Sequence, residues 1–123
     1  MRPEIEILIQ SDLDDIICEI YKLNLYLERD YKISFLKTKD GVEIDLIVEI
    51  SARKKYCIAI KAGEVKDLSA FNAQYKLAKD LCAKELIVLS QNKIAQVQDG
   101  IHVMPWQEGI ETIMKLGIER APT

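Results

Sequence analysis

The sequence predicts one α/β domain, in which a mixed sheet of four main strands in the order αβββαβ is flanked by helices and followed by a small C-terminal β/α extension. Three observations predict this fold. A helical apolar stripe precedes segments that alternate with a period of two, an Asp-Gly pair joins two of these segments, and a helix separates the last two main strands. Such a crossover joins parallel strands and is right-handed. At 123 residues, the whole chain (residues 1–123) has the size of a single domain.

The first helix is expected to begin near residue 11. Residues 4–9 form a short strand or a lead-in, and Ser11 is the expected N-cap, with acidic residues in the first turn at Asp12, Asp14 and Asp15. The helix then buries a stripe whose members are spaced by three or four residues: Leu13, Ile16, Ile20, Leu23 and Leu27.

Three strands are expected to follow as an antiparallel meander. Residues 32–37 and 42–50 are joined through Asp40-Gly41, which favours a hairpin because both turn positions adopt positive φ. Alternation in the second strand predicts one face with Ile44, Leu46, Val48 and Ile50, and an opposite face with Glu43, Asp45, Ile47 and Glu49. Residues 56–61 form the third strand.

The C-terminal half adds a helix, a buried strand and the extension. A helix over residues 67–83 is expected to bury Leu68, Phe71, Tyr75, Ala78 and Cys82. Residues 85–90 are an uninterrupted apolar run, typical of a strand covered on both faces. Short strands at 93–97 and 101–104 and a helix that begins at Pro105 form the extension, and residues 119–123 are an expected frayed tail.

Composition excludes several classes of protein. The chain is 49% hydrophobic and 30% charged, which is ordinary for a soluble domain, and its net charge of −3 argues against a generally basic DNA-coating protein. The three cysteines have no CxxC or zinc-site spacing, which favours a reducing compartment. No secretory signal begins the sequence, and no apolar run approaches the ~20 residues of a membrane helix. We therefore expect a cytoplasmic protein with no membrane partner.

Two polar residues on strands that should be buried are the most informative feature. Asp45 lies in the middle of EIDLIVEI, and Lys61 ends CIAIK on the next strand. If the register agrees, both side chains face one side of the sheet, where burying either charge alone is costly. A mid-strand carboxylate can hold a divalent cation for phosphodiester hydrolysis, with the lysine orienting water or stabilising the phosphate. The alternative is a structural ion pair at a strand end.

Three segments of the chain resemble a known family: FLKTKDGVEIDLIVE, YCIAIKAGEVK and DGIHVMPWQEGIETI. Together they resemble the C-terminal domain of unknown function in prokaryotic AAA-type ATPases, a member of the PD-(D/E)XK nuclease-like superfamily. The resemblance spans residues 13–116 and implies a restriction-endonuclease-like fold. It also implies that Asp45 is the metal-binding aspartate, that Lys61 is the catalytic lysine, and that Glu43 and Glu19 add carboxylates around Mg²⁺ or Mn²⁺.

Ala59 departs from this family pattern, because the position two residues before Lys61 should be a glutamate. Three explanations stay open: the domain has lost catalysis, the alanine is an introduced substitution, or another carboxylate such as Glu64 replaces the missing ligand. We therefore expect a nuclease-like domain that hydrolyses DNA with a metal ion if active, and that is weakened or inactive at position 59. The alternative is a non-catalytic module that binds nucleic acid or protein.

Other residues give weaker indications of partners. Four basic residues are predicted to contact nucleic acid, with a solvated loop as the alternative: Lys39, Arg53, Lys54 and Lys55. His102 and Trp106 are expected to be structural. The chain has no GxxxxGK[ST] motif and does not bind ATP by that route, so an ATPase module or a second copy of the chain is a further expected partner.

Overall fold

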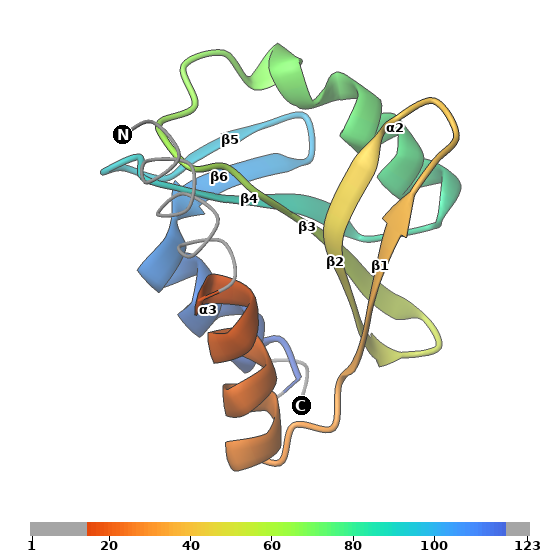
Figure 1. Ribbon diagram of the computed structural model, residues 1–123, viewed down its shortest axis with the longest axis vertical. Helices are drawn as coiled ribbons and strands as arrows, with labels where there is room; N and C mark the ends of the chain where they lie inside the picture. Colours follow the sequence, from red (N-terminus) through yellow and green to blue (C-terminus); the bar gives the residue numbers. More distant parts are fainter. Residues whose placement is uncertain (1–14, 118–123) are drawn as a thin grey trace, which may run out of the picture.

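A six-stranded mixed sheet with helices on both faces forms the centre of the protein (Figure 1). The computed structural model describes residues 15–117. The strand expected at 4–9, the N-cap expected at Ser11 and the tail expected at 119–123 lie outside the described residues. No helix within residues 15–117 is both long enough and apolar enough to cross a bilayer.

The elements follow the predicted order along the chain. The N-terminal helix occupies residues 15–26 of the described part. The strands are β1 (Lys32–Lys37), β2 (Glu43–Ser51), β3 (Lys54–Ile60), β4 (Glu85–Ser90), β5 (Gln96–Gln98) and β6 (Ile101–Pro105). Between β3 and β4 lie the 3₁₀ helix η1 (Leu68–Phe71) and the helix α2 (Asn72–Asp80), and α3 (Trp106–Lys115) follows β6.

The strand pairing confirms the predicted meander and crossover but enlarges the sheet. β1, β2 and β3 pair antiparallel, and β3 pairs parallel with β4. The four-stranded prediction was wrong, because β6 pairs parallel with β4 and β5 pairs with β6. The fully buried Val103 faces Val88 across this pairing. The segment predicted as an extension therefore completes the sheet.

The second helix is shorter than the predicted span of residues 67–83. Asp67 caps its start, with the carboxylate accepting a hydrogen bond from the Ser69 amide at 3.0 Å, and the first turn is 3₁₀ rather than α. Its end is set by Cys82, whose φ of 63° lies in the left-handed region that commonly closes a helix. Cys82 is consequently exposed and does not join the buried stripe.

An extra residue in β2 changes which side chains share a face. Against β1, the register moves from Ser34↔Ile47 to Leu36↔Ile44, so three steps on β2 oppose two steps on β1. This is a β-bulge, which breaks the alternation of the strand. Leu46 remains on the expected face, but Ile44 packs in the cluster on the opposite face, so its predicted face was wrong.

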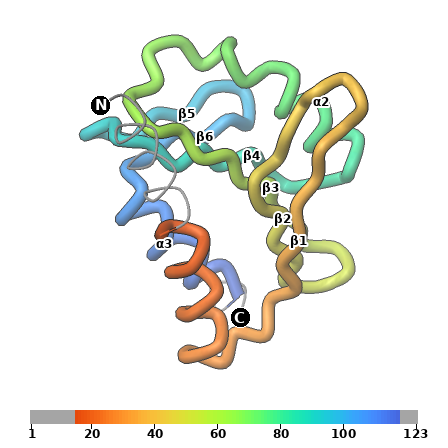
Figure 2. Tube along the Cα trace, viewed as in Figure 1, coloured from red at the N-terminus to blue at the C-terminus, as the bar shows by residue number. Residues whose placement is uncertain are grey.

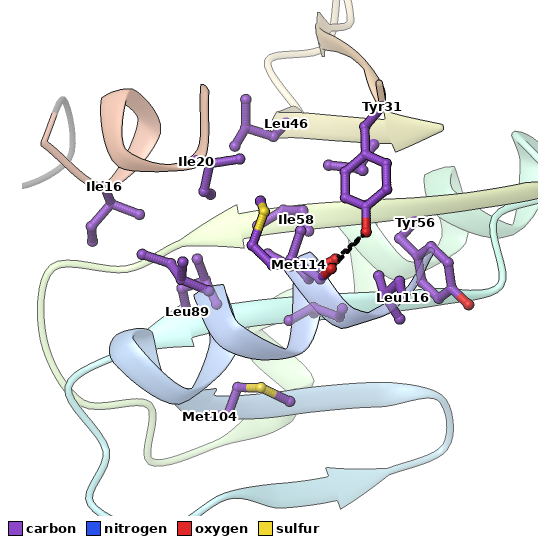
Figure 3. Close-up of a cluster of buried hydrophobic side chains, with 14 residues drawn as sticks. Ile16, Ile20, Tyr31, Leu46, Tyr56, Ile58, Leu89, Met104, Met114 and Leu116 are labelled. Atoms are coloured by element: carbon purple, nitrogen blue, oxygen red, sulfur yellow. Dashed lines mark hydrogen bonds between the residues drawn. The ribbon is translucent and has the colours of Figure 1, made fainter. Parts of the chain in front are cut away.

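Two hydrophobic clusters cover the two faces of the sheet. One packs the N-terminal helix and α3 against side chains such as Leu46, Ile58 and Leu89 (Figure 3). The other packs η1 and α2 against side chains such as Cys57 and Val88. The Cα trace shows the N-terminal helix and α3 together on one side of the sheet and α2 on the other (Figure 2). Because both faces are covered, the centre of the sheet is almost free of polar side chains.

Tyr31 ties the end of α3 to the chain between the N-terminal helix and β1. Its buried hydroxyl lies 2.9 Å from the Ile113 carbonyl and 3.0 Å from the Met114 carbonyl, and it accepts from the Gly117 amide at 2.9 Å (Figure 3). Asn24 fixes the same tyrosine through its main chain, because its side-chain amide donates to the Tyr31 carbonyl and accepts from the Tyr31 N–H. These bonds satisfy groups at the end of a helix, where carbonyls lack intrahelical partners.

Replacing this hydroxyl should destabilise the fold. We expect Tyr31→Phe to lower the free energy of unfolding by about 1–3 kcal/mol, because the Gly117 amide and the α3 carbonyls lose a buried partner. Urea unfolding measures the change. Tyr26→Phe is the matched control, since the Tyr26 side chain is 82% exposed and should tolerate the change. Equal stability of the two variants would contradict the anchoring role of Tyr31.

Candidate functional site

Asp45 lies where β2 and β3 separate. The last residue pair on this side of the ladder is Leu46↔Ile58, and beyond it the Asp45 carboxylate accepts a hydrogen bond from the Ile60 amide at 2.7 Å. The next amide, that of Lys61, donates to the Leu89 carbonyl of β4 at 2.8 Å, so the Ile60 amide points towards β2. The carboxylate thus takes the place that a main-chain carbonyl of β2 would occupy in a continued ladder.

The environment of Asp45 favours its neutral form. Partial burial raises the pKa of the carboxyl group, the hydrogen bond from Ile60 opposes that shift, and the nearby charge of Glu43 adds to it. Glu43 itself is exposed and lies 3.6 Å from the Lys37 ammonium on β1. The surroundings of the Asp45 carboxylate therefore disfavour its charged form.

Ala59 and Lys61 flank Ile60 but have different surroundings. The Ala59 methyl is 4% exposed and packs in the cluster beneath α2. Lys61 is exposed and, with Asp15 and Trp106, borders a cavity of about 210 Å³ at the end of β3. Among residues 15–117, no ion pair within 4 Å joins Asp45 to Lys61, so the alternative of a structural ion pair at this strand end is not formed.

The remaining predicted carboxylates are dispersed. Glu19 lines a groove between the N-terminal helix and α3, whose lining residues do not include Asp45. Glu64 is exposed in the loop after β3. Within the part of the chain that the structure describes, no group of three His, Cys, Asp or Glu side chains is placed to hold a metal ion. The structure brings the Asp45 carboxylate to the Ile60 amide, between positions 59 and 61, but the described lining of the Glu19 groove includes none of these residues.

The predicted nucleic-acid contacts lie at two ends of the sheet. Lys39 is in the turn between β1 and β2, whereas Arg53, Lys54 and Lys55 are at the turn between β2 and β3. β2 has nine residues, and at about 3.3 Å per residue it separates the two turns by roughly 26 Å. Lys55 also lies 3.7 Å from Glu49. The four residues therefore do not form one basic edge.

Two polar contacts were not predicted from the sequence. The His102 Nε2 lies 3.3 Å from the Glu85 carboxylate across the β4–β6 pair. Asn92 clamps the loop after β3, since its side chain accepts from the Val65 amide at 2.7 Å and donates to the Val65 carbonyl at 3.0 Å. Trp106 packs against the core cluster, as expected of a structural residue, but it is half-buried and also borders two hollows. The residues Gln91-Asn92 predict a turn, but the sequence does not reveal that the Asn92 side chain binds the main chain of Val65.

Asp45 offers a test that separates its charge from its hydrogen bond. The pKa of Asp45 is higher in the folded protein than the unfolded value of about 3.9, so this group contributes its full stabilisation of the fold below the unfolded pKa. The contribution to the free energy of unfolding is lost as the pH rises through the folded pKa. Asp45→Asn keeps an acceptor for Ile60 without the charge, so it should raise the melting temperature at pH 7 and lose this advantage in acid. Asp45→Ala should be about 1 kcal/mol less stable than Asp45→Asn, because Ile60 loses its acceptor.

Thermal unfolding of the three proteins between acid and neutral pH measures both effects. If Asp45→Asn were the less stable protein at neutral pH, the ionised carboxylate would be a stabilising group, and the hydrogen bond from Ile60 would outweigh the cost of burying the charge.

Comparison with known proteins gives a family but no characterised relative. No curated protein and no solved structure matches the chain. A family described as a domain of unknown function, DUF4143, matches residues 16–108, from the N-terminal helix to the first turn of α3. This match covers most of the chain and all six strands. The chain therefore belongs to the DUF4143 family.

Proposed function

We propose that this chain is a non-catalytic protein-binding module built on a nuclease-type fold. The observation that carries the proposal is what occupies positions 45 and 59, the two strand positions of the expected metal site. The Asp45 carboxylate is engaged by the Ile60 amide at 2.7 Å, and position 59 is a buried methyl group. A hard divalent cation needs several oxygen ligands, so these two positions are poorly suited to hold one.

The nuclease ancestry is part of the proposal. Its support is the order of a helix, three antiparallel strands, a helix and a parallel strand, together with the resemblance of the KDGVEID, AIK and MPW segments to the PD-(D/E)XK superfamily. Loss of the ligand at position 59 would leave Asp45 free to serve the fold. Its hydrogen bond to the strand that once carried the second ligand is consistent with that change of role.

Metal-dependent hydrolysis of DNA is the second candidate function. The observation that favours it is the position of Asp45, a half-buried carboxylate of raised pKa beside the segment that ends in the exposed Lys61. Perturbed carboxylates of this kind often mark active sites, although structural sites perturb them too. Mg²⁺ or Mn²⁺ would be the cofactor in that case, with Asp45 and Glu43 as its available ligands.

The response to metal distinguishes the two functions. We expect Mg²⁺ and Mn²⁺ to leave the melting temperature of the native chain unchanged and to support no cleavage of single-stranded, duplex or branched DNA. A functional metal site would instead raise the melting temperature, because a ligand at 100 times its Kd stabilises the folded state by about 2.7 kcal/mol. A metal-dependent rise in melting temperature that Asp45→Asn abolishes, together with cleavage, would replace our proposal by the hydrolytic function.

Restoring the missing ligand gives a second, independent test. Ala59→Glu inserts a carboxylate into an apolar cluster, so we expect it to cost about 3 kcal/mol or more of stability. Ala73→Glu is the matched control, because Ala73 is exposed on α2. If Mg²⁺ or Mn²⁺ restored the stability of Ala59→Glu but had no effect on Ala73→Glu, the ancestral metal site would still be competent.

A further inference from the structure

An open groove runs between the two helices that cover one face of the sheet. The N-terminal helix and α3 lie side by side there (Figure 2), and the groove between them has a volume of about 650 Å³. This lies within the ~300–1,000 Å³ of typical ligand pockets. Asp15, Glu19, Lys22 and Leu23 line it from one helix, and their spacing of four, three and one places them on a single helical face.

The floor of the groove is apolar and has an anchor point at one end. Ile110 belongs to the core cluster at this face, and the partly buried side chains of Leu23 and Trp106 pack against it. Trp106 and Asp15 also border the smaller cavity of about 210 Å³ that reaches Lys61. A partner that lies along the groove can therefore insert an apolar side chain beside the indole ring.

The rim of the groove is acidic. Among the described residues that line it, Asp15, Glu19 and Glu111 contribute three carboxylates, against the single ammonium of Lys22. No ion pair within 4 Å among residues 15–117 involves any of these four side chains. The rim therefore presents uncompensated negative charge on both sides of an apolar floor, which is complementary to a segment with apolar residues on one side and lysine or arginine on its flanks.

We propose that the groove between the N-terminal helix and α3 binds a cationic amphipathic segment of a partner protein. The inference rests on the proposed function as a protein-binding module and specifies the chemistry of the partner. Leu25, which is 81% exposed, and Tyr21, which is 48% exposed, line a separate hollow that shares Lys22 with the groove. A helix of the partner would pack beside the N-terminal helix and α3 as a third helix on this face of the sheet.

Charge argues against two other occupants. Residues 1–14 of the chain itself carry Arg2 but four acids: Glu4, Glu6, Asp12 and Asp14. That segment and the groove would repel each other. A nucleic acid is disfavoured as well, because the same three carboxylates would repel its phosphates. Nucleic-acid affinity depends instead on lysine and arginine side chains that replace counterions.

The chain contains its own reporters for the test. Trp106 is the only tryptophan, so intrinsic fluorescence reports on the groove directly. Cys18 is exposed and lines the groove, while Cys82 is exposed at the end of α2, outside it. Burial raises the pKa of the Cys57 thiol to about 11, so this third cysteine stays unreactive near neutral pH. Alkylation therefore compares one groove cysteine with one internal control.

The probe is a synthetic amphipathic peptide with leucine on one helical face and lysine on the other, and its control carries glutamate in place of each lysine. We expect the lysine peptide to shift Trp106 emission and to slow alkylation of Cys18 but not of Cys82, with an affinity that falls as salt rises. Glu19→Lys with Glu111→Lys should weaken binding on the order of tenfold. Asp80→Lys, a single charge reversal on α2, is the control outside the groove and should bind normally.

Three results would overturn the inference: equal binding of the glutamate peptide, binding that leaves Trp106 and Cys18 unaffected, or protection of Cys18 by single-stranded DNA instead of the lysine peptide. Glu19→Gln with Glu111→Gln, which removes charge without reversing it, should give an intermediate loss if the first pair of substitutions disturbs folding. Metal-dependent cleavage would refute the proposed function separately, because the groove and the Asp45 site share no described residue.

Discussion

The burial of the sheet on both faces is the constraint on which the rest of the structure depends. β4 lies between β3 and β6, with helices over each face, and its residues from Leu86 to Ser90 are all buried. A strand in this position can carry almost no unpaired polar group, because a buried charge without a partner is costly. Polar chemistry is therefore confined to the strand ends, where Asp45, Lys61 and the Asn92 clamp are found.

Periodicity was sufficient to predict the order of elements and the parallel crossover, because these depend on local patterns and on chain handedness. It could not reveal the bulge in β2, since one inserted residue changes the facing of Ile44 without any change in composition. It also could not show that β6 joins β4, because a five-residue strand is stabilised by its neighbours rather than by its own sequence. Nor could periodicity show that the Asp45 carboxylate accepts a hydrogen bond from the Ile60 amide, because only the separation of the strands makes this contact possible.

Asp45 makes a structural hydrogen bond in surroundings that disfavour its own charge. The hydrogen bond to Ile60 closes the frayed end of the β2–β3 ladder, while burial and Glu43 disfavour the charge that makes this bond strong. A neutral acceptor such as asparagine would serve the ladder without that penalty. Under the nuclease ancestry that we propose, the acid at this position would be a remnant of a charge-dependent site rather than an optimum for stability.

The two edges of the sheet are poorly suited to binding a further strand. At one edge of the sheet, a two-fold antiparallel pairing of β1 with a second copy would oppose Lys32 and Lys37 of the two chains, and like charges on edge strands discourage such pairing. At the other edge, β5 has only three residues. Strand addition is thus disfavoured at both edges, whereas the groove beside Trp106 combines an apolar floor with unpaired carboxylates. Because that surface lies on two helices packed against the sheet core, it is preorganised, and a partner that docks there orders mainly its own segment.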